Sequence, residues 1–321
     1  MSFSDADWLA AAAELAARGS PLSRPNPAVG AVIVKEGRVI GRGWTRAGGR
    51  PHAEAEALAQ AGEAARGATA YVTLEPCAHA GERGPACAHL LIAAELARVV
   101  IGVLDPDPRT NGRGQFLLQA AGIKADHVPS PAASRSLEGY LTRTCLGRPH
   151  TTLKLATSLD GCIAMADGTS QWITGSEARA HGHTLRARMD AILVGGETLR
   201  ADSPRLDVRL PGLEARSPAR WVLTRGAAPE GWQALYDPAE STFGDAQTLL
   251  VEGGAGAAAA FLAADRVDRL LLYRAPILIG AGRRGLGDIG LGSLGEAHGR
   301  WCHADRRQLG SDTLDVYDRT R

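Results

Sequence analysis

Four residues in the first third of the chain have the types and spacing of a catalytic metal site. His52 and Glu54 lie two positions apart at the start of a predicted helix. Cys77 follows a predicted strand, and Cys87 comes ten residues later. One His and two Cys ligands bind zinc tetrahedrally and leave a fourth position for water. Zinc lowers the pKa of that water toward about 7, so the spacing predicts a hydrolytic zinc centre.

Glu54 is predicted to be close to this metal without being a ligand. The order H-x-E followed by P-C and a second Cys is typical of zinc deaminases, in which the Glu is the general acid and base. A single Cys is more often a small buried hydrophobic residue. A structural zinc site would fill all four positions and could recruit His79 or His89. The conjunction of the two motifs favours the catalytic interpretation.

Alternating helices and strands are expected to position these residues. The expected elements are a helix at 5–18, strands at 28–34 and 38–44, a helix at 52–65, a strand at 68–74, a helix at 87–96, a strand at 97–103 and a helix at 114–121. Such alternation predicts a sheet covered by helices on both faces.

Residues 128–149 interrupt this alternation with Pro, Ser and Gly, and are predicted to be a linker. The expected domains are therefore 1–145 and 146–321. The second half alternates again, with strands expected at 150–161, 191–195, 221–224, 248–252 and 269–280 and helices at 176–188 and 254–264. The stretch after about Gly285 carries no motif.

Two glycine-rich segments follow strands in the second half, at 194–198 and 251–256. Each opens a predicted helix, whose free N–H groups and dipole favour a phosphate. Gly254-x-Gly256-x-x-Ala259 fits a relaxed dinucleotide fingerprint, although no acidic residue follows about 20 positions later. Glycine also simply permits tight turns, so both interpretations stay open from these residues alone.

The bulk composition favours a small-molecule enzyme. The 36 basic and 35 acidic residues leave a net charge of +1, which offers no electrostatic footprint for nucleic acid. No run reaches the roughly 18 apolar residues of a membrane span. Five scattered cysteines suit free or metal-bound thiols in a reducing compartment, and the N-terminus does not read as a signal peptide. We therefore expect a cytoplasmic protein that binds neither nucleic acid nor membrane.

The first half resembles the bifunctional deaminase/reductase family of riboflavin biosynthesis. The resemblance rests on the runs NPAVGAVIV (26–34), AGGRPHAE (47–54), TLEPCAHAG (73–81), DPDP (105–108) and AGI (121–123). It implies that His52, Cys77 and Cys87 bind zinc and that Glu54 is the proton donor. It also implies that Asn26 and His79 contact the substrate.

The chain departs from this family around the substrate phosphate. The spacing between the two metal-site cysteines is one residue longer than the family's. A basic residue expected there falls on Glu82 or Arg83, depending on how the loop is aligned. A His expected seven residues before His52 is Thr45. The group that binds the phosphate in this half is therefore left open.

The second half resembles the reductase part of the same family. The runs are LKLATSLDG (153–161), SQWIT (170–174), LRA (185–187), DSPRL (202–206) and VEGG (251–254). The resemblance implies NADPH contacts from Ala156, Trp172, Thr198, Asp202 and a loop at 254–260 that includes Gly254, Ala255 and Gly256. It implies substrate contacts from Ser170, Arg186, Leu206, Arg209 and Glu252. Lys154 or Asp202 would act near the reacting carbon, and Thr224, where the family often has Asp, is given no role.

The resemblance implies a cytidine-deaminase-like α/β/α sandwich followed by a dihydrofolate-reductase-like α/β domain. Its first reaction is the hydrolytic removal of the 2-amino group of 2,5-diamino-6-(5-phosphoribosylamino)pyrimidin-4-one. In its second reaction, NADPH reduces the opened ribose at C1′ to a ribityl chain. Whether the intermediate passes directly between the domains, and whether the chain forms a homo-oligomer, stays open.

Two other functions are compatible with parts of the pattern. A deaminase acting on nucleic acid shares the zinc motif, and predicts a salt-sensitive affinity for tRNA or single-stranded DNA. A zinc-stabilised module that senses NADPH would keep both motifs and would not need Glu54. The near-neutral charge and the second nucleotide-binding half disfavour the first alternative.

Overall fold

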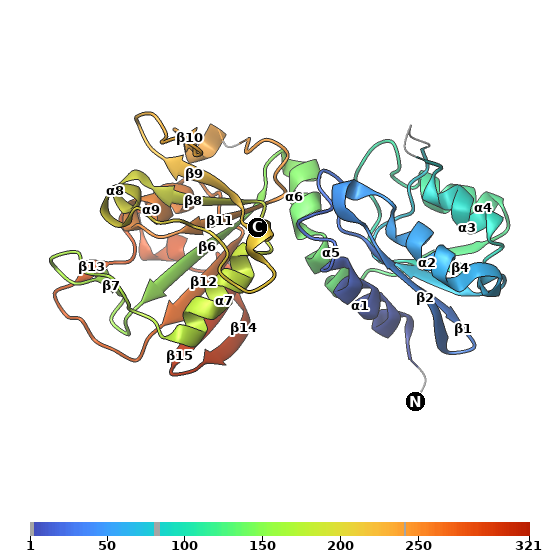
Figure 1. Ribbon diagram of the computed structural model, residues 1–321, viewed down its shortest axis with the longest axis horizontal. Helices are drawn as coiled ribbons and strands as arrows, with labels where there is room; N and C mark the ends of the chain where they lie inside the picture. Colours follow the sequence, from blue (N-terminus) through green and yellow to red (C-terminus); the bar gives the residue numbers. More distant parts are fainter. Residues whose placement is uncertain (1–2, 80–83, 241) are drawn as a thin grey trace. The chain divides into compact units, whose positions relative to one another are not determined.

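The computed structural model describes residues 3–79, 84–240 and 242–321 of the chain (Figure 1). The chain forms two compact units, Met1–Arg148 and Pro149–Arg321. The border was expected at 145, on the basis of the Pro- and Gly-containing segment before it. Among the described residues, no helix is both long and apolar enough to cross a membrane.

The first unit is built on a five-stranded sheet with the order β2-β1-β3-β4-β5. Its strands are β1 (Gly30–Lys35), β2 (Arg38–Trp44), β3 (Thr69–Val72), β4 (Arg98–Ile101) and β5 (Lys124–His127). Strand β1 is antiparallel to β2 and β3, whereas β3, β4 and β5 are parallel. Because the carboxyl ends of parallel strands meet at one edge, the loops after β3 and β4 leave the sheet side by side.

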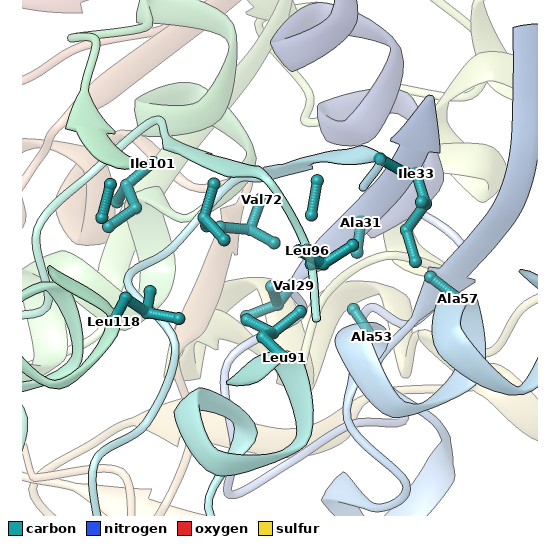
Figure 2. Packing of buried hydrophobic residues seen from close by; sticks show 14 of the residues in the cluster. Val29, Ala31, Ile33, Ala53, Ala57, Val72, Leu91, Leu96, Ile101 and Leu118 are labelled. Carbon is teal, nitrogen blue, oxygen red and sulfur yellow. The ribbon is translucent and has the colours of Figure 1, made fainter. Parts of the chain in front are cut away.

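Helices cover both faces of this sheet, as the alternation predicted. Its helices are α1 (Asp5–Ala16), α2 (Ala53–Ala61), α3 (Cys87–Ala93), α4 (Arg113–Ala120), α5 (Pro131–Ser136) and α6 (Glu138–Leu146). Figure 2 shows one core layer, in which Ala31 and Ile33 of β1 face α2 and Leu91 of α3. Val32 and Val34 point the other way and pack with Leu9 of α1. The strand alternates between two cores because successive side chains point to opposite faces.

Two glycines of β2 let α2 lie directly on the sheet. A Cβ at Gly41 would lie 2.2 Å from the carbonyl oxygen of Ala57, and one at Gly43 would lie 2.1 Å from that of Ala53. No other residue fits such an approach. This close packing sets the position of His52, the residue immediately before α2.

The prediction of a linker over 128–149 is wrong, because helices α5 and α6 occupy most of the segment. The Ser130 side chain accepts a hydrogen bond from the Ala133 amide, and Pro131 occupies the first turn of α5. Ser followed by Pro is a signal for the start of a helix as well as for a loop. Leu137, between the two helices, is buried in the core of the first unit. The segment therefore belongs to that domain.

The second unit contains an eight-stranded sheet with the order β10-β9-β8-β11-β6-β12-β15-β14. Its strands are β6 (His150–Thr157), β8 (Ala191–Gly195), β9 (Ala219–Leu223), β10 (Gln233–Leu235), β11 (Thr248–Glu252), β12 (Arg269–Arg274), β14 (Trp301–Leu309) and β15 (Asp312–Arg319). From β10 to β12 in this order, neighbouring strands are parallel. Strand β15 is antiparallel to both β12 and β14. A separate pair joins β7 (Cys162–Ala164) to β13 (Arg283–Arg284).

The helices of this unit lie on opposite faces of its sheet. Helix α9 (Ala255–Ala263) inserts Phe261 into the core with Leu193 and Val251. Helix α7 (Ser176–Arg186) packs Ala178 against Tyr273 on the other face. A short helix α8 (Gly196–Asp202) follows β8 directly. The architecture is the predicted α/β class.

Two details of the second unit differ from expectation. Residues 254–260, expected both to begin a helix and to form a cofactor-binding loop, are mostly the first turns of α9. The stretch after 285, which had no interpretable motif, contains the long β14–β15 hairpin. Most side chains of β14 are exposed and polar because it is the edge strand, so the alternation that indicates a strand is weak there.

Candidate metal centre and cofactor site

The three predicted zinc ligands come together in the first unit from three different elements. His52 is the cap residue of α2, Cys77 follows β3, and Cys87 is the first residue of α3. Their ligand atoms all lie within 4.8 Å of one another. His52 Nδ1 is 3.3 Å from Cys87 Sγ and 3.7 Å from Cys77 Sγ. The imidazole therefore turns its Nδ1 toward the two sulfur atoms.

The two thiols are suited to bind a soft metal. The Cys87 amide donates a hydrogen bond to Cys77 Sγ at 3.2 Å. Hydrogen bonding from the Cys87 thiol lowers the pKa of Cys77 to about 4, whereas this contact and burial raise the pKa of Cys87. A thiolate is thus already favoured at one sulfur. In the part of the chain that the structure describes, no fourth His, Cys, Asp or Glu joins the group. The set fits a zinc site with one open position.

Asn26, a predicted substrate contact, lies against the metal-site histidine. Its Nδ2 is 3.1 Å from His52 Nε2 and donates a hydrogen bond to the Gly49 carbonyl at 2.9 Å. Gly49 has φ +84°, and a Cβ there would lie 2.6 Å from Asn26. The turn at Gly49 therefore holds Asn26 beside the imidazole.

Glu54 lies next to the ligand group without belonging to it. Its side chain is buried, with 4% of the residue exposed, and it lines the cavity beside His52 and Cys77. Burial raises the pKa of Glu54, although the charge of His52 partly opposes this. A buried carboxyl group beside a metal position can accept and return protons.

These residues open into a cavity of about 140 Å³. Its walls come from separate segments of the first unit and combine polar with apolar side chains. They comprise Pro25, Asn26, Pro27, Val29, Thr45, His52, Glu54, Leu74, Glu75, Cys77, His79, Asp105, Asp107, Arg109 and Tyr140. His79, a predicted substrate contact, lies on this wall with its Nδ1 3.5 Å from Thr110 Oγ1. The cavity thus brings together Asn26, His79 and Glu54, the predicted pyrimidine contacts and proton carrier of this half.

Glu75 organises one wall and was not singled out from the sequence. Its carboxylate is 2% exposed and accepts hydrogen bonds from three backbone amides. The donors are Asp105 at 3.2 Å, Gly112 at 3.0 Å and Gln115 at 3.1 Å. Glu75 therefore fixes the loop after β4 against the loop that carries Cys77. The sequence signal that could have identified Glu75 is its position, as a carboxylate between a buried strand and the Pro76-Cys77 pair.

One departure from the family, Thr45, lies at this cavity. Thr45 is 1% exposed, and its Oγ1 accepts a hydrogen bond from the Val29 amide at 3.0 Å. It therefore anchors the chain before β1. Glu82 and Arg83, the two candidates for the phosphate ligand, lie outside the described residues.

In the second unit, two predicted substrate contacts form a buried ion pair. Arg186, at the end of α7, binds Glu252, at the end of β11, through Nε–Oε1 at 2.7 Å and Nη2–Oε2 at 2.8 Å. Lys154 of β6 stands beside Glu252 in the sheet register. Its Nζ lies 5.6 Å from the centre of the Tyr273 ring. Lys154, Arg186 and Glu252, far apart in sequence, thus lie close together at the end of β11.

The predicted cofactor residues lie around the adjacent strand ends. A Cβ at Gly254, which has φ +78°, would lie 2.7 Å from Thr198 Oγ1. The starts of α8 and α9 are therefore in contact, and Ala255 and Gly256 form the first turn of α9. Ala156 lies on β6, two residues beyond Lys154.

The remaining predicted residues occupy the periphery of this unit. Ser170 and Trp172 lie between β7 and α7, where the Trp172 ring packs under the Arg179 guanidinium at 4.9 Å. Leu206 is buried with φ +53°. Asp202 and Arg209 are exposed, at the end of α8 and after Val208 respectively. Asp202 is thus exposed to solvent, whereas Lys154 lies beside Glu252.

Comparison with family models matches both units. The model described as the cytidine and deoxycytidylate deaminase zinc-binding region matches residues 3–103. The model described as the RibD C-terminal domain matches residues 149–243 and 241–313.

Full-length relatives extend this match. The riboflavin biosynthesis protein RibD of Escherichia coli (strain K12) is 40% identical, over 91% of this chain and 94% of that protein. The RibD protein of Haemophilus influenzae is 36% identical, over 98% of each chain.

Solved structures agree. Acinetobacter baumannii RibD, form 1, has a TM-score of 0.87 at 36% identity and covers 99% of each chain. A Thermotoga maritima structure titled as a diaminohydroxyphosphoribosylaminopyrimidine deaminase/5-amino-6-(5-phosphoribosylamino)uracil reductase has a TM-score of 0.87 at 30% identity, over 98% of this chain and 99% of that one.

Proposed function

We propose residue roles for both reactions of this chain, which belongs to the RibD family of bifunctional riboflavin-biosynthesis enzymes. The protein is a zinc-dependent deaminase in its N-terminal domain and an NADPH-dependent reductase in its C-terminal domain. The observation that carries the first assignment is the meeting of His52, Cys77 and Cys87 within 4.8 Å beside buried Glu54.

In the deaminase, His52, Cys77 and Cys87 hold the zinc ion. When bound, zinc supplies Lewis acidity that lowers the pKa of water at the open position. Glu54 takes a proton from the attacking water and delivers protons to the ring nitrogen and to the departing amino group. Water thus provides the new carbonyl oxygen, and the 2-amino group leaves as ammonia. Asn26 and His79 orient the pyrimidine.

In the reductase, the nicotinamide of NADPH supplies the hydride to C1′ of the opened ribose. Thr198, Gly254, Ala255 and Gly256 lie where helix N-termini offer free amides to cofactor phosphates. Ala156, Trp172 and Asp202 complete the proposed cofactor contacts. Ser170, Leu206 and Arg209 join the Arg186–Glu252 pair as substrate contacts.

Lys154 is the better candidate for the group that delivers the proton in this second reaction. It is half-buried next to Glu252, whereas Asp202 is exposed at the end of α8. An ammonium group held beside a carboxylate in a central strand can reach a bound substrate. A carboxylate in solvent is not positioned in this way.

We place the deaminase domain at 1–148 and the reductase domain at 149–321, because residues 138–146 form α6 of the first unit. We also place the protein in the cytoplasm, acting on a small molecule rather than on nucleic acid. The near-neutral net charge of +1 supports a small-molecule substrate rather than nucleic acid.

The decisive experiment measures ammonia release and NADPH oxidation by the purified, zinc-loaded protein with the diaminopyrimidine substrate. Both signals are expected, and NADPH oxidation should follow deamination. Absence of ammonia release would contradict the deaminase assignment, whereas release without NADPH oxidation would contradict the reductase assignment. Tight, salt-sensitive binding to tRNA or single-stranded DNA would instead favour a nucleic-acid deaminase.

A further inference from the structure

One wall of the deaminase cavity is formed by two loops that leave adjacent parallel strands. The loop after β3 carries His79, and the loop after β4 carries Asp107 and Arg109. Strands β3 and β4 pair from Thr69 opposite Arg98 to Val72 opposite Ile101, so both loops leave at the same edge of the sheet. His79 and Arg109 therefore belong to the same side of the cavity.

Arg109 is the only Arg or Lys among the described residues that line this cavity. Four of the other lining residues are carboxylic acids, namely Glu54, Glu75, Asp105 and Asp107. Glu54 is 4% exposed and lies deep beside the metal ligands, whereas the Arg109 side chain is 69% exposed. Arg109 thus places a positive charge at the outer end of a cavity whose inner walls repel anions.

The Arg109 guanidinium is held in one orientation with part of its donor set unused. Its Nε lies 3.0 Å from both Asp107 carboxylate oxygens, and its Nη2 lies 2.5 Å from Oδ2. The Arg109 amide also donates to Asp107 Oδ1 at 2.9 Å. Among contacts between the described residues, Arg109 uses Nε and Nη2, and its Nη1 donors face no described partner. A guanidinium fixed in this way loses little freedom when an anion binds.

The loop that presents Arg109 is itself anchored. Asp105 donates its amide to Glu75, and its Oδ1 accepts hydrogen bonds from the Tyr140 hydroxyl at 2.7 Å and from the Asp107 amide at 3.0 Å. Gly112 ties the other end of the loop to Glu75. Arg109 therefore lies in a loop whose two ends, at Asp105 and Gly112, are both hydrogen-bonded to Glu75.

We propose that Arg109 binds the phosphate of the phosphoribosylaminopyrimidine at the outer end of the deaminase cavity. The inference rests on the proposed deaminase function, since it needs a substrate whose reacting ring lies at Glu54 and whose phosphate lies away from it. Arginine suits a phosphate because its planar N–H groups match the phosphate oxygens. Among the described residues that line the cavity, no other Arg or Lys is present to bind the phosphate dianion.

The test compares ammonia release from the phosphorylated substrate and from its 5′-dephosphorylated counterpart. Arg109→Ala should raise KM for the phosphorylated substrate by about 10-fold or more, with a small change in kcat. The same variant should leave the dephosphorylated compound unaffected. Arg113→Ala is the matched control, because Arg113 is an exposed arginine of the same segment that does not line the cavity. It should behave as wild type.

Zinc content and reductase activity with the deaminated intermediate should stay unchanged in both variants, which shows that the fold is intact. Equal losses with the two substrates, or no loss with either, would overturn the assignment. So would a phosphate-specific loss in Arg83→Ala with none in Arg109→Ala. If the unaltered enzyme releases ammonia from neither compound, the deaminase function itself fails and this role for Arg109 falls with it.

Discussion

Arg186 and Glu252 form a two-bond ion pair that joins the end of α7 to the end of β11. Their side chains are only 15% and 11% exposed. Arg186 Nη1 also donates to the Asp207 carbonyl at 3.1 Å. The pair therefore ties together a helix, a central strand and the segment after α8, beside the residues proposed to bind substrate. It has a structural role in addition to any contact with the ligand.

Glu252→Gln should lower the stability of the reductase domain in a pH-dependent way. Burial alone would raise the pKa of Glu252, but hydrogen bonding to Arg186 and the charge of Lys154 bring the pKa below its ordinary 4.5. A carboxyl group with a lowered pKa stabilises the fold fully above its unfolded-state pKa, and this contribution is lost as pH falls through the lower, folded-state pKa. Breaking a buried pair costs on the order of 3 kcal/mol near neutral pH.

Urea unfolding of wild type and Glu252→Gln, followed from pH 7 downward, measures this effect. The difference in the free energy of unfolding should be largest at neutral pH and should shrink below about pH 4.5. Arg205→Ala is the control, because the exposed Arg205–Asp207 pair is expected to contribute little. A difference that stays constant over the whole range would contradict the role of the ionised pair.

Removing one metal-site sulfur should abolish deamination and leave the other domain intact. Cys87→Ser replaces a thiolate by a hydroxyl group, which is a much weaker zinc ligand. Elemental analysis should give about one zinc per wild-type chain and clearly less in the variant, and NADPH binding should be retained. Cys145→Ser changes an exposed cysteine outside the site and should alter neither property. Full zinc content in Cys87→Ser would remove Cys87 from the ligand set.

Glu54→Gln should separate metal binding from proton transfer. The amide keeps the size of the side chain but cannot cycle a proton, so deamination should fall by roughly 10²-fold or more. Zinc content should not change, because Glu54 lies outside the ligand group. Parallel loss of zinc and activity would make Glu54 a ligand or a structural residue. Unchanged deamination would show that Glu54 is not the proton carrier.

A fragment of residues 149–321 should fold by itself and act as a reductase. All residues proposed to bind NADPH and the ribosyl substrate lie in this unit, which has its own sheet and core. The fragment should contain no zinc and should oxidise NADPH when given the deaminated intermediate. The full chain with Cys87→Ser serves as the reference. A soluble, folded fragment that does not bind NADPH would show that the cofactor site needs the other domain.

NADPH should be preferred over NADH, with Arg200 as the first candidate for the 2′-phosphate. Strands β8 and β9 are parallel neighbours, so the segments that follow them lie together. A Cβ at Gly196 would lie 3.3 Å from Arg200 Nη1 and 3.7 Å from Thr224 Oγ1. Arg205 is engaged by Asp207 at 2.7 Å, which makes it less available than Arg200 or Arg225.

A charge-assisted contact of this kind gives about 10- to 100-fold discrimination. Reduction rates at low concentrations of each cofactor should show that preference in wild type. Arg200→Ala, or Arg225→Ala if that residue is the partner, should reduce the preference by raising KM for NADPH alone. Arg205→Ala should not. Equal use of both cofactors by the wild-type enzyme would refute the assignment.

Short local motifs are sufficient to identify the chemistry of this protein. The H-x-E and P-C motifs select His52, Glu54, Cys77 and Cys87, because zinc chemistry restricts both the residue types and their order along the chain. Helical periodicity locates most helices, and continuous apolar runs locate the buried strands, since those strands face a core on both sides. The motifs for the two halves also appear in the correct order.

The errors arose where local signals have two meanings. Ser130-Pro131 was interpreted as part of a linker, yet Ser and Pro also begin helices, and only burial of the following residues distinguishes the two cases. Strand β14 was missed because an exposed edge strand needs no apolar face. Asp202 and Lys154 were equivalent candidates in sequence, and only the parallel pairing of β6 with β11 places Lys154 beside Glu252.

The sequence by itself determined the reaction type, because metal ligands and their proton carrier lie in short motifs whose residue types allow few substitutes. Only the tertiary structure decided which other residues form the wall of the deaminase cavity. Glu75 acts through backbone amides 30 to 40 residues away, and Arg109 reaches the cavity because β3 and β4 end at the same edge of the sheet. Such contacts leave no periodic or short-range trace, since they depend on strand order and on the path of a loop through space.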